Sequence, residues 1–187
     1  MRPGKYLQEF YNGQFDLETV AKYIGACAAE HMTLQIARSV DDVVAVYSNT
    51  GITSCMDGNH FRTPSRHPCR VYGDSDLGVA YYGPINDINA RAVVWPDKHI
   101  YSRLYGNEAV LKSLLESAGY HKGELDGARI RCIKGRNGGY VVPYIDYIDG
   151  AEDTGNGFLT LGDGNIGCQS TDGYADAENN THSCQNC

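Results

Sequence analysis

The chain has 187 residues, a mass of 20.5 kDa and 42% apolar residues, which suffices for one globular domain with a buried core. No run approaches the roughly 18 consecutive apolar residues of a membrane-spanning helix, and residues 1–20 lack the apolar stretch of a signal peptide. We therefore expect neither export nor insertion into a membrane.

The formal net charge of −7 is distributed unevenly along the chain. Residues 1–56 carry 4 basic and 6 acidic groups, residues 57–140 carry 12 and 9, and residues 141–187 carry no basic and 8 acidic groups. Because phosphate backbones repel the acidic end, any contact with nucleic acid is expected in the basic middle. The 7 cysteines are an odd number and too few for a disulfide scaffold, which favours a reducing compartment.

The first predicted elements are two helices followed by a loop. Apolar residues recur at helical spacing after Asp16, which predicts an amphipathic helix over residues 17–31. A shorter helix is expected after Ser39, with Val40, Val43, Val44 and Tyr47 on one side. Residues 48–68 are rich in turn-forming residues and show no period, which predicts a long loop.

The middle of the chain is expected to form strands and one further helix. Short β-type runs separated by turn residues predict an antiparallel meander: CRVYG (69–73), LGVAYYG (77–83), INARAVVWP (88–96) and HIYSRLYG (99–106). Residues 107–118 predict a helix with Asn107 at its N-cap, and strands are expected at about 128–133 and 139–146. This order predicts an α+β fold with N-terminal helices, a meander and one packed helix.

The composition changes after Gly150, where glycines and acidic residues leave little apolar material. FLTL (158–161) and the following GDGN turn predict one small hairpin. We therefore divide the chain into an α+β domain over residues 1–150 and an acidic, glycine-rich tail over residues 151–187, which needs a cross-link or docking to become ordered.

The tail carries a candidate metal site. Cys184 and Cys187 form a C-x-x-C, a spacing at which two thiolates can bind one tetrahedral Zn²⁺, and Cys168 and His182 could complete the ligands. An unstructured tail and a redox C-x-x-C are the alternatives, although a thioredoxin-type motif would open a helix after a strand.

The loop over residues 48–68 carries two further candidate sites. Cys55 with His60 or His67 could act as nucleophile and base, since a thiolate needs a nearby proton acceptor or cation to form near neutral pH. An anion-binding role is the second possibility, because planar guanidinium groups suit phosphate and carboxylate. Its candidate residues are Arg62, Arg66 and Arg70, helped by Arg91 and Arg103 in the meander.

The chain resembles a family of uncharacterised tailed-bacteriophage proteins over about residues 50–146. The resemblance is carried by SCM (54–56), HPCRVYG (67–73), DLGVAYYG (76–83), ARAVVWP (90–96), YSRLYG (101–106), AGY (118–120) and YVVPYID (140–146). It implies expression in the cytoplasm of an infected bacterium and an accessory or host-takeover role. Similar proteins continue into zinc-knuckle-like segments, which agrees with SCQNC at residues 183–187, although only one full knuckle is present here.

Three functions follow from these observations. The first is a bacteriophage accessory protein that binds a host or viral macromolecule, for example to inhibit a bacterial defence system such as CRISPR. The second is a cysteine-dependent enzyme that uses Cys55 with His60 or His67. The third is a protein that binds nucleic acid through residues 60–136, with an affinity that falls steeply as salt is added.

Overall fold

The computed structural model describes residues 32–48, 52, 68–134, 138–143, 148 and 150–167. The chain divides into two compact units, Met1–Thr33 and Leu34–Cys187, and every element below belongs to the second. The elements in chain order are β1 (Gln35–Ala37), α3 (Val40–Tyr47), η2 (Pro68–Tyr72), β2 (Gly78–Tyr82), β3 (Ala90–Trp95), η3 (Pro96–Lys98), β4 (Ile100–Gly106), α4 (Glu108–Ser117), β5 (His121–Lys122), β6 (Arg129–Arg131), β7 (Gly150–Asp153), β8 (Phe158–Gly162) and β9 (Ile166–Gly167).

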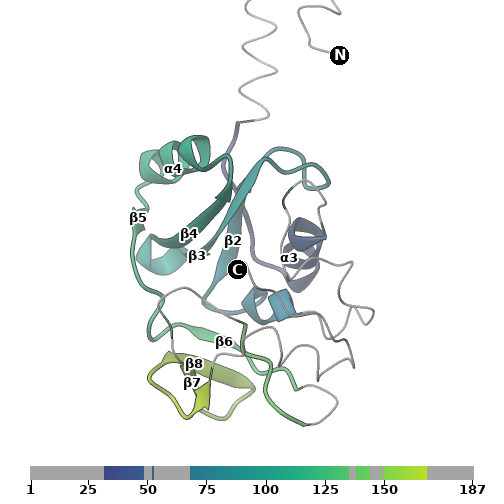
Figure 1. Ribbon diagram of the computed structural model, residues 1–187, viewed down its shortest axis with the longest axis vertical. Coiled ribbons are helices and arrows are strands. Elements are labelled where there is room, and N and C mark those ends of the chain that lie inside the picture. The colour runs from purple at the N-terminus through teal and green to yellow at the C-terminus, as the bar shows by residue number, and fades with distance from the viewer. Residues whose placement is uncertain are drawn as a thin grey trace, which may run out of the picture. The chain divides into compact units, whose positions relative to one another are not determined.

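Five strands form the larger sheet, in the order β1-β2-β3-β4-β5 (Figure 1). The pairs from β1 to β4 are antiparallel, and β5 pairs with β4 in parallel after the chain has passed through α4. The meander predicted over residues 77–106 is therefore confirmed as β2-β3-β4. A β-bulge between Ala92 and Val94 shifts the register of β3 against β4.

Both faces of this sheet are covered, because every residue of β2 and β3 is buried. Successive strand residues point to opposite faces. The face that contains Ala92 and Val94 packs on Leu111 and Leu115 of α4. The opposite face packs on α3 and η2, so α3 and α4 lie on opposite sides of the strands in Figure 1.

The two helices lie at the predicted positions for identifiable reasons. Ser39 caps α3, since its hydroxyl oxygen accepts from the Asp42 amide at 3.1 Å and its hydroxyl donates to the Asp42 carboxylate at 2.7 Å. Asn107 precedes α4 as expected, although its side chain makes no capping hydrogen bond. The predicted helix over residues 17–31 lies outside the described residues.

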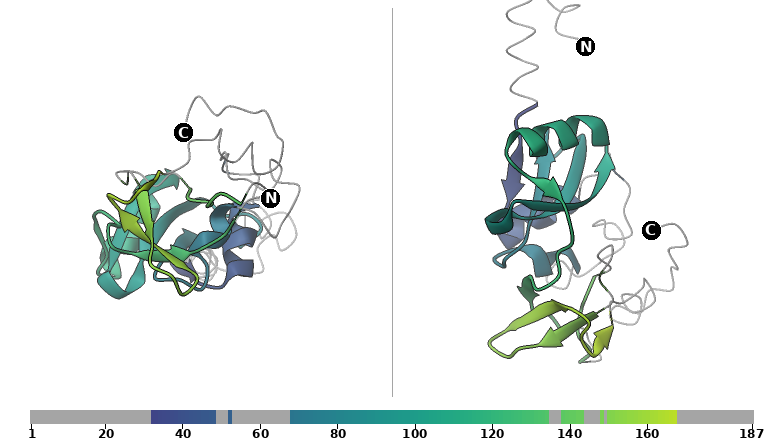
Figure 2. Two further views of the ribbon diagram at one scale, coloured as in Figure 1. Left: turned by 90° about the horizontal axis from the view of Figure 1, so that it is seen from below. Right: turned by 90° about the vertical axis from the view of Figure 1, so that its left-hand side faces the viewer.

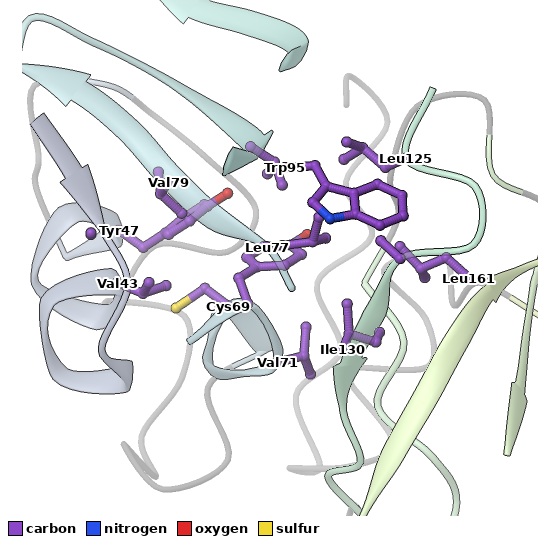
Figure 3. Close-up of a cluster of buried hydrophobic side chains, with 14 of the residues drawn as sticks. Val43, Tyr47, Cys69, Val71, Leu77, Val79, Trp95, Leu125, Ile130 and Leu161 are labelled. Carbon is purple, nitrogen blue, oxygen red and sulfur yellow. The ribbon is translucent and has the colours of Figure 1, made fainter. Parts of the chain in front are cut away.

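A smaller sheet in the order β6-β8-β7-β9 shares the core on the α3 side of the larger sheet. It is the yellow-green sheet, seen away from α4 in Figure 1 and in the right-hand view of Figure 2. In Figure 3 Trp95 of β3 lies beside Leu125 and Leu161, and Ile130 of β6 lies near Val71 of η2. One apolar core therefore includes residues of both sheets.

Two local expectations were wrong. Residues 69–73 were expected to form a strand, but Pro68–Tyr72 form a 3-10 helix that packs its apolar residues on α3. A hairpin was also expected from residues 158–161 and the following GDGN turn. Instead, β8 pairs with β7 through the turn over residues 154–157 and with β6 on its other side, and β9 pairs with β7. Gly164 of that turn passes so close to Ala151 that a Cβ atom would lie 2.0 Å from its carbonyl oxygen.

The α+β fold predicted from the sequence is confirmed. Of the strand expected over residues 139–146, the described part contains only a bridge between Lys134 and Tyr140. No helix in the described part of the chain has both the length and the apolar character needed to cross a membrane.

An ion pair connects the turn before β2 with strand β6. Arg129 binds both carboxylate oxygens of Asp76, through Nη2 at 2.8 Å and Nε at 3.1 Å, and its backbone amide donates to the same carboxylate at 2.9 Å. These hydrogen bonds favour the ionised carboxylate and hold the pKa of Asp76 below its ordinary value of 3.8.

The lowered pKa of Asp76 predicts a dependence of stability on pH. A carboxyl whose pKa is lower in the folded state contributes stability above its unfolded pKa and loses that contribution as the pH falls through the folded pKa. We expect Asp76→Asn to be less stable than the wild type at pH 6 and to lose less stability on acidification below about pH 4. Urea unfolding midpoints at several pH values test this; parallel curves for the two proteins would contradict it.

Candidate functional site

Most of the site residues predicted from the sequence lie outside the described part of the chain. These are Cys55, His60, Arg62, Arg66, His67, Cys168, His182, Cys184 and Cys187. Arg70 is described and lies half-buried in η2. The structure therefore does not test whether these candidates lie together, and their roles stay predictions.

The described residues next to the arginine-rich segment over residues 53–67 are buried. Ile52 on its N-terminal side is 9% exposed, and Cys69, one residue beyond Pro68 on its C-terminal side, is fully buried. Both side chains belong to the core that packs on α3. Both ends of the segment are consequently attached to the folded core.

A buried arginine interacts with residues on both sides of the segment. Arg91 of β3 is 2% exposed, and its Nη1 donates to the Ile52 carbonyl oxygen at 3.3 Å. Its guanidinium carbon is 4.7 Å from the centroid of the Tyr47 ring. Arg91 also interacts electrostatically with the Cys69 thiol. One cation thus contacts Tyr47 of α3 and Ile52, and its charge also acts on Cys69 beyond the segment.

The alternation of β3 explains why this arginine is buried. Arg91, Val93 and Trp95 point to the side of the sheet that carries α3 and η2, while Ala90, Ala92 and Val94 face α4. From the sequence, Arg91 was expected only to assist the loop arginines in binding an anion. The signal that could have marked it is a single charged residue at an inward position of the apolar run ARAVVW.

A second arginine lies beside the same group of tyrosines. The guanidinium carbons of Arg91 and Arg103 are each 5.4 Å from the centroid of the Tyr105 ring. Tyr105 is opposite Arg91 in the register of β3 and β4. Arg103 is exposed and Tyr105 is half-buried, so this group extends from the surface to the buried Arg91. We call Arg91, Arg103, Tyr47 and Tyr105 the arginine–tyrosine cluster.

Burial controls the titration of the groups around Arg91. It raises the pKa of the Tyr47 hydroxyl, and the nearby Arg91 cation opposes this effect. Burial likewise raises the pKa of the Cys69 thiol, against the opposing charges of Arg70 and Arg91. Both groups are therefore neutral near pH 7, and Arg91 gains no anionic partner from either of them.

The raised pKa predicts that Cys69 is chemically inert in the folded protein, since the thiolate is the reactive form. We expect Cys69 to resist alkylation by iodoacetamide at pH 8 in the native protein and to react readily in urea. Peptide mass spectrometry after timed labelling measures both rates. Native labelling of Cys69 as fast as in the unfolded chain would show that this thiol is accessible.

A second group of ionisable residues lies at the smaller sheet. The Tyr140 hydroxyl donates to the Asp153 carboxylate at 2.6 Å, and Lys134 Nζ is 4.7 Å from the Tyr140 ring centroid. The hydrogen bond raises the pKa of Tyr140 and lowers that of Asp153. Burial and the Asp153 charge raise the pKa of Cys132, which disfavours its thiolate. The hydrogen bond between Tyr140 and Asp153 connects the β-bridge at Tyr140 with strand β7.

No group of three or more histidine, cysteine, aspartate or glutamate side chains within the described ranges could hold a metal ion. The zinc ligands predicted from the sequence lie in residues 168–187, outside those ranges, and zinc binding stays a prediction. The two described cysteines, Cys69 and Cys132, are thiols.

No family model matches the chain, and searches of curated proteins and of solved structures found no match either.

Proposed function

We propose that this protein is a bacteriophage accessory protein that acts in the bacterial cytoplasm by binding a host or viral macromolecule. The segment over residues 53–67 is the proposed recognition element. Inhibition of a bacterial defence system is one activity that such binding would serve. The sequence resemblance to tailed-phage proteins supports the biological setting, and the structure supports the choice of segment.

The observation that carries the proposal is the attachment of both ends of this segment near Arg91. The Ile52 carbonyl oxygen accepts a hydrogen bond from Arg91. Cys69 lies in the same core as Ile52, and the charge of Arg91 acts on its thiol. Connections longer than about 12–15 residues are uncommon in compact domains and frequently carry binding functions. Attachment at both ends lowers the entropy that such a segment loses when it binds.

The composition of the segment supports recognition of a macromolecule. It contains Arg62, Arg66, His60 and Phe61 within a few positions, and arginine and aromatic residues are enriched at the centres of protein interfaces. The same two arginines are predicted from the sequence to bind an anion. The surface of the partner is therefore expected to carry negative charge where it meets this segment.

A capture experiment with charge-reversed variants tests the proposal. Tagged wild-type protein is expressed in phage-infected bacteria and recovered at physiological salt. We expect one macromolecule to be recovered in stoichiometric amount, and the double variant Arg62→Glu/Arg66→Glu to recover at least tenfold less, because reversed charges at an interface cost several kcal/mol.

Lys112→Glu/Lys122→Glu is the matched control, because it reverses two exposed charges on α4 and β5 and leaves residues 53–67 unchanged. This variant should recover the same partner as the wild type. Equal recovery by the loop variant and the control would assign the binding to another surface, and the proposed role of residues 53–67 would be wrong.

A further inference from the structure

The turn between β7 and β8 contains an asparagine that is followed by a glycine, Asn156–Gly157. Residues 152–157 are all exposed. Gly155, Asn156 and Gly157 have φ angles of 75°, 57° and 82°, so three successive residues lie in the left-handed region. Asparagine tolerates this conformation better than most residues, and glycine adopts it freely. The residue types of the turn therefore suit its backbone.

Few contacts hold the reactive groups of this turn. Within the described ranges, no hydrogen bond involves the Asn156 side chain or the Gly157 backbone amide. A Cβ atom placed on Gly155 or on Gly157 would meet nothing within 4 Å. The backbone on either side of Asn156 therefore has open space in which to rotate, and the Gly157 nitrogen can approach the Asn156 side chain.

Asn107 is a contrast to Asn156, because it is also exposed. Its side chain forms a hydrogen bond with the Tyr82 side chain, and the next residue is Glu108, the first of α4. The Cβ atom of Glu108 crowds the approach of its own amide nitrogen to the preceding side chain, whereas Gly157 has no Cβ atom. Of these two asparagines, Asn156 is thus the one that its neighbour can attack.

We propose that Asn156 is a site of spontaneous deamidation. The Gly157 amide nitrogen loses its proton to water and attacks Cγ of Asn156, an intramolecular step that proximity favours. The N–Cγ bond forms, the Cγ–Nδ2 bond breaks, and Nδ2 takes up a proton and leaves as ammonia. Water then opens the resulting five-membered succinimide at either of its two carbonyl carbons, which gives aspartate or isoaspartate. The reaction consumes one water molecule and needs no oxidant, reductant or cofactor.

The products would change the smaller sheet. Either product adds a carboxylate to a turn that follows the carboxylate of Asp153, and isoaspartate also lengthens the main chain by one carbon atom. That atom lies within the turn that the Phe158 amide closes on the Gly155 carbonyl oxygen at 3.2 Å. The next hydrogen bond, from the Cys132 amide to the Gly157 carbonyl oxygen at 2.8 Å, continues the pairing of β6 with β8. Isoaspartate is therefore expected to weaken both hydrogen bonds. This inference goes beyond the proposed function and depends on no partner.

Timed incubation of the purified full-length protein at pH 8 tests the proposal. Fragment mass spectra locate each asparagine at which OH has replaced NH2, so Asn12 and Asn137, which also precede glycines, are measured separately. We expect Asn156 to convert about tenfold faster than Asn107, because Gly157 lacks a Cβ atom. In the native protein Asn156 should convert within about tenfold of its rate in urea, since the fold holds neither reacting group in place.

Asn156→Gly is the matched variant, because glycine keeps the left-handed backbone and removes the carboxamide. Incubated wild-type protein should exchange the Phe158 and Cys132 amides faster than fresh protein, and incubated Asn156→Gly should not. Conversion of Asn156 no faster than that of Asn107, or strong protection of Asn156 by the native fold, would overturn the proposal. The comparison with Asn107 is made within the wild-type chain and is independent of how the variant folds.

Discussion

Truncation of Trp95 to alanine is expected to lower the free energy of unfolding by about 3–5 kcal/mol, the usual cost of removing a buried aromatic side chain. Trp95 is 7% exposed and belongs to the core that includes Leu125, Ile130 and Leu161. Its loss should therefore loosen the contact between the two sheets. Urea unfolding gives the free energy, and hydrogen exchange of the β6 and β8 amides shows the local effect.

Leu111→Ala is the matched comparison for Trp95→Ala, because Leu111 is fully buried on the opposite face of the larger sheet. We expect a loss of about 2–5 kcal/mol, with faster exchange concentrated in α4. Exchange patterns that are the same in both variants would mean that the two faces do not act as separate apolar clusters.

Replacement of Arg91 by methionine should separate binding from stability. An uncompensated buried charge is costly, and apolar replacements of buried charged groups are frequently neutral or stabilising by about 1–4 kcal/mol. The lost hydrogen bond to Ile52 offsets part of this gain, about 1 kcal/mol. We expect Arg91→Met to unfold at the same urea concentration as the wild type or higher, and to recover at least tenfold less of the macromolecule in the capture experiment, because residues 53–67 lose the hydrogen bond at Ile52.

The opposite outcome for Arg91→Met has a clear meaning. A fall of more than about 2 kcal/mol in the free energy of unfolding, with capture of the macromolecule retained, would make Arg91 a structural residue that holds Ile52 in place. The same urea experiment on Tyr47→Phe measures the contribution of the Tyr47 hydroxyl group alone, because this variant keeps the aromatic ring beside Arg91.

Local sequence signals predicted the elements that depend on local interactions. The Ser39 cap and the period of α3 are encoded within a few residues, and so are the alternation of LGVAYY and the leucine spacing of α4. Strand β1 was missed because three residues show no period, and its place at the sheet edge comes from pairing with β2. Residues 68–72 have strand-like composition but fold as a 3-10 helix on α3.

The sequence indicated only part of the candidate site, because the rest depends on contacts between residues that are far apart in the chain. The arginines of the loop could be recognised as anion-binding candidates from their type and spacing. The burial of Arg91 depends on contacts with Tyr47 and Ile52, which are 44 and 39 positions away in the chain. The position of Arg91 inside the apolar run ARAVVW could have marked it as inward-facing, whereas its hydrogen-bond partners required three-dimensional contacts.

Site-specific photo-crosslinking in phage-infected bacteria is the most direct measurement of the claim that residues 53–67 recognise a macromolecule. A photoreactive amino acid replaces Ser65 in one variant and Lys112 of α4 in another. We expect one discrete crosslinked product from position 65, lost when Arg91→Met is added, and none from position 112. The same products from both positions, or a product from position 112 alone, would contradict it.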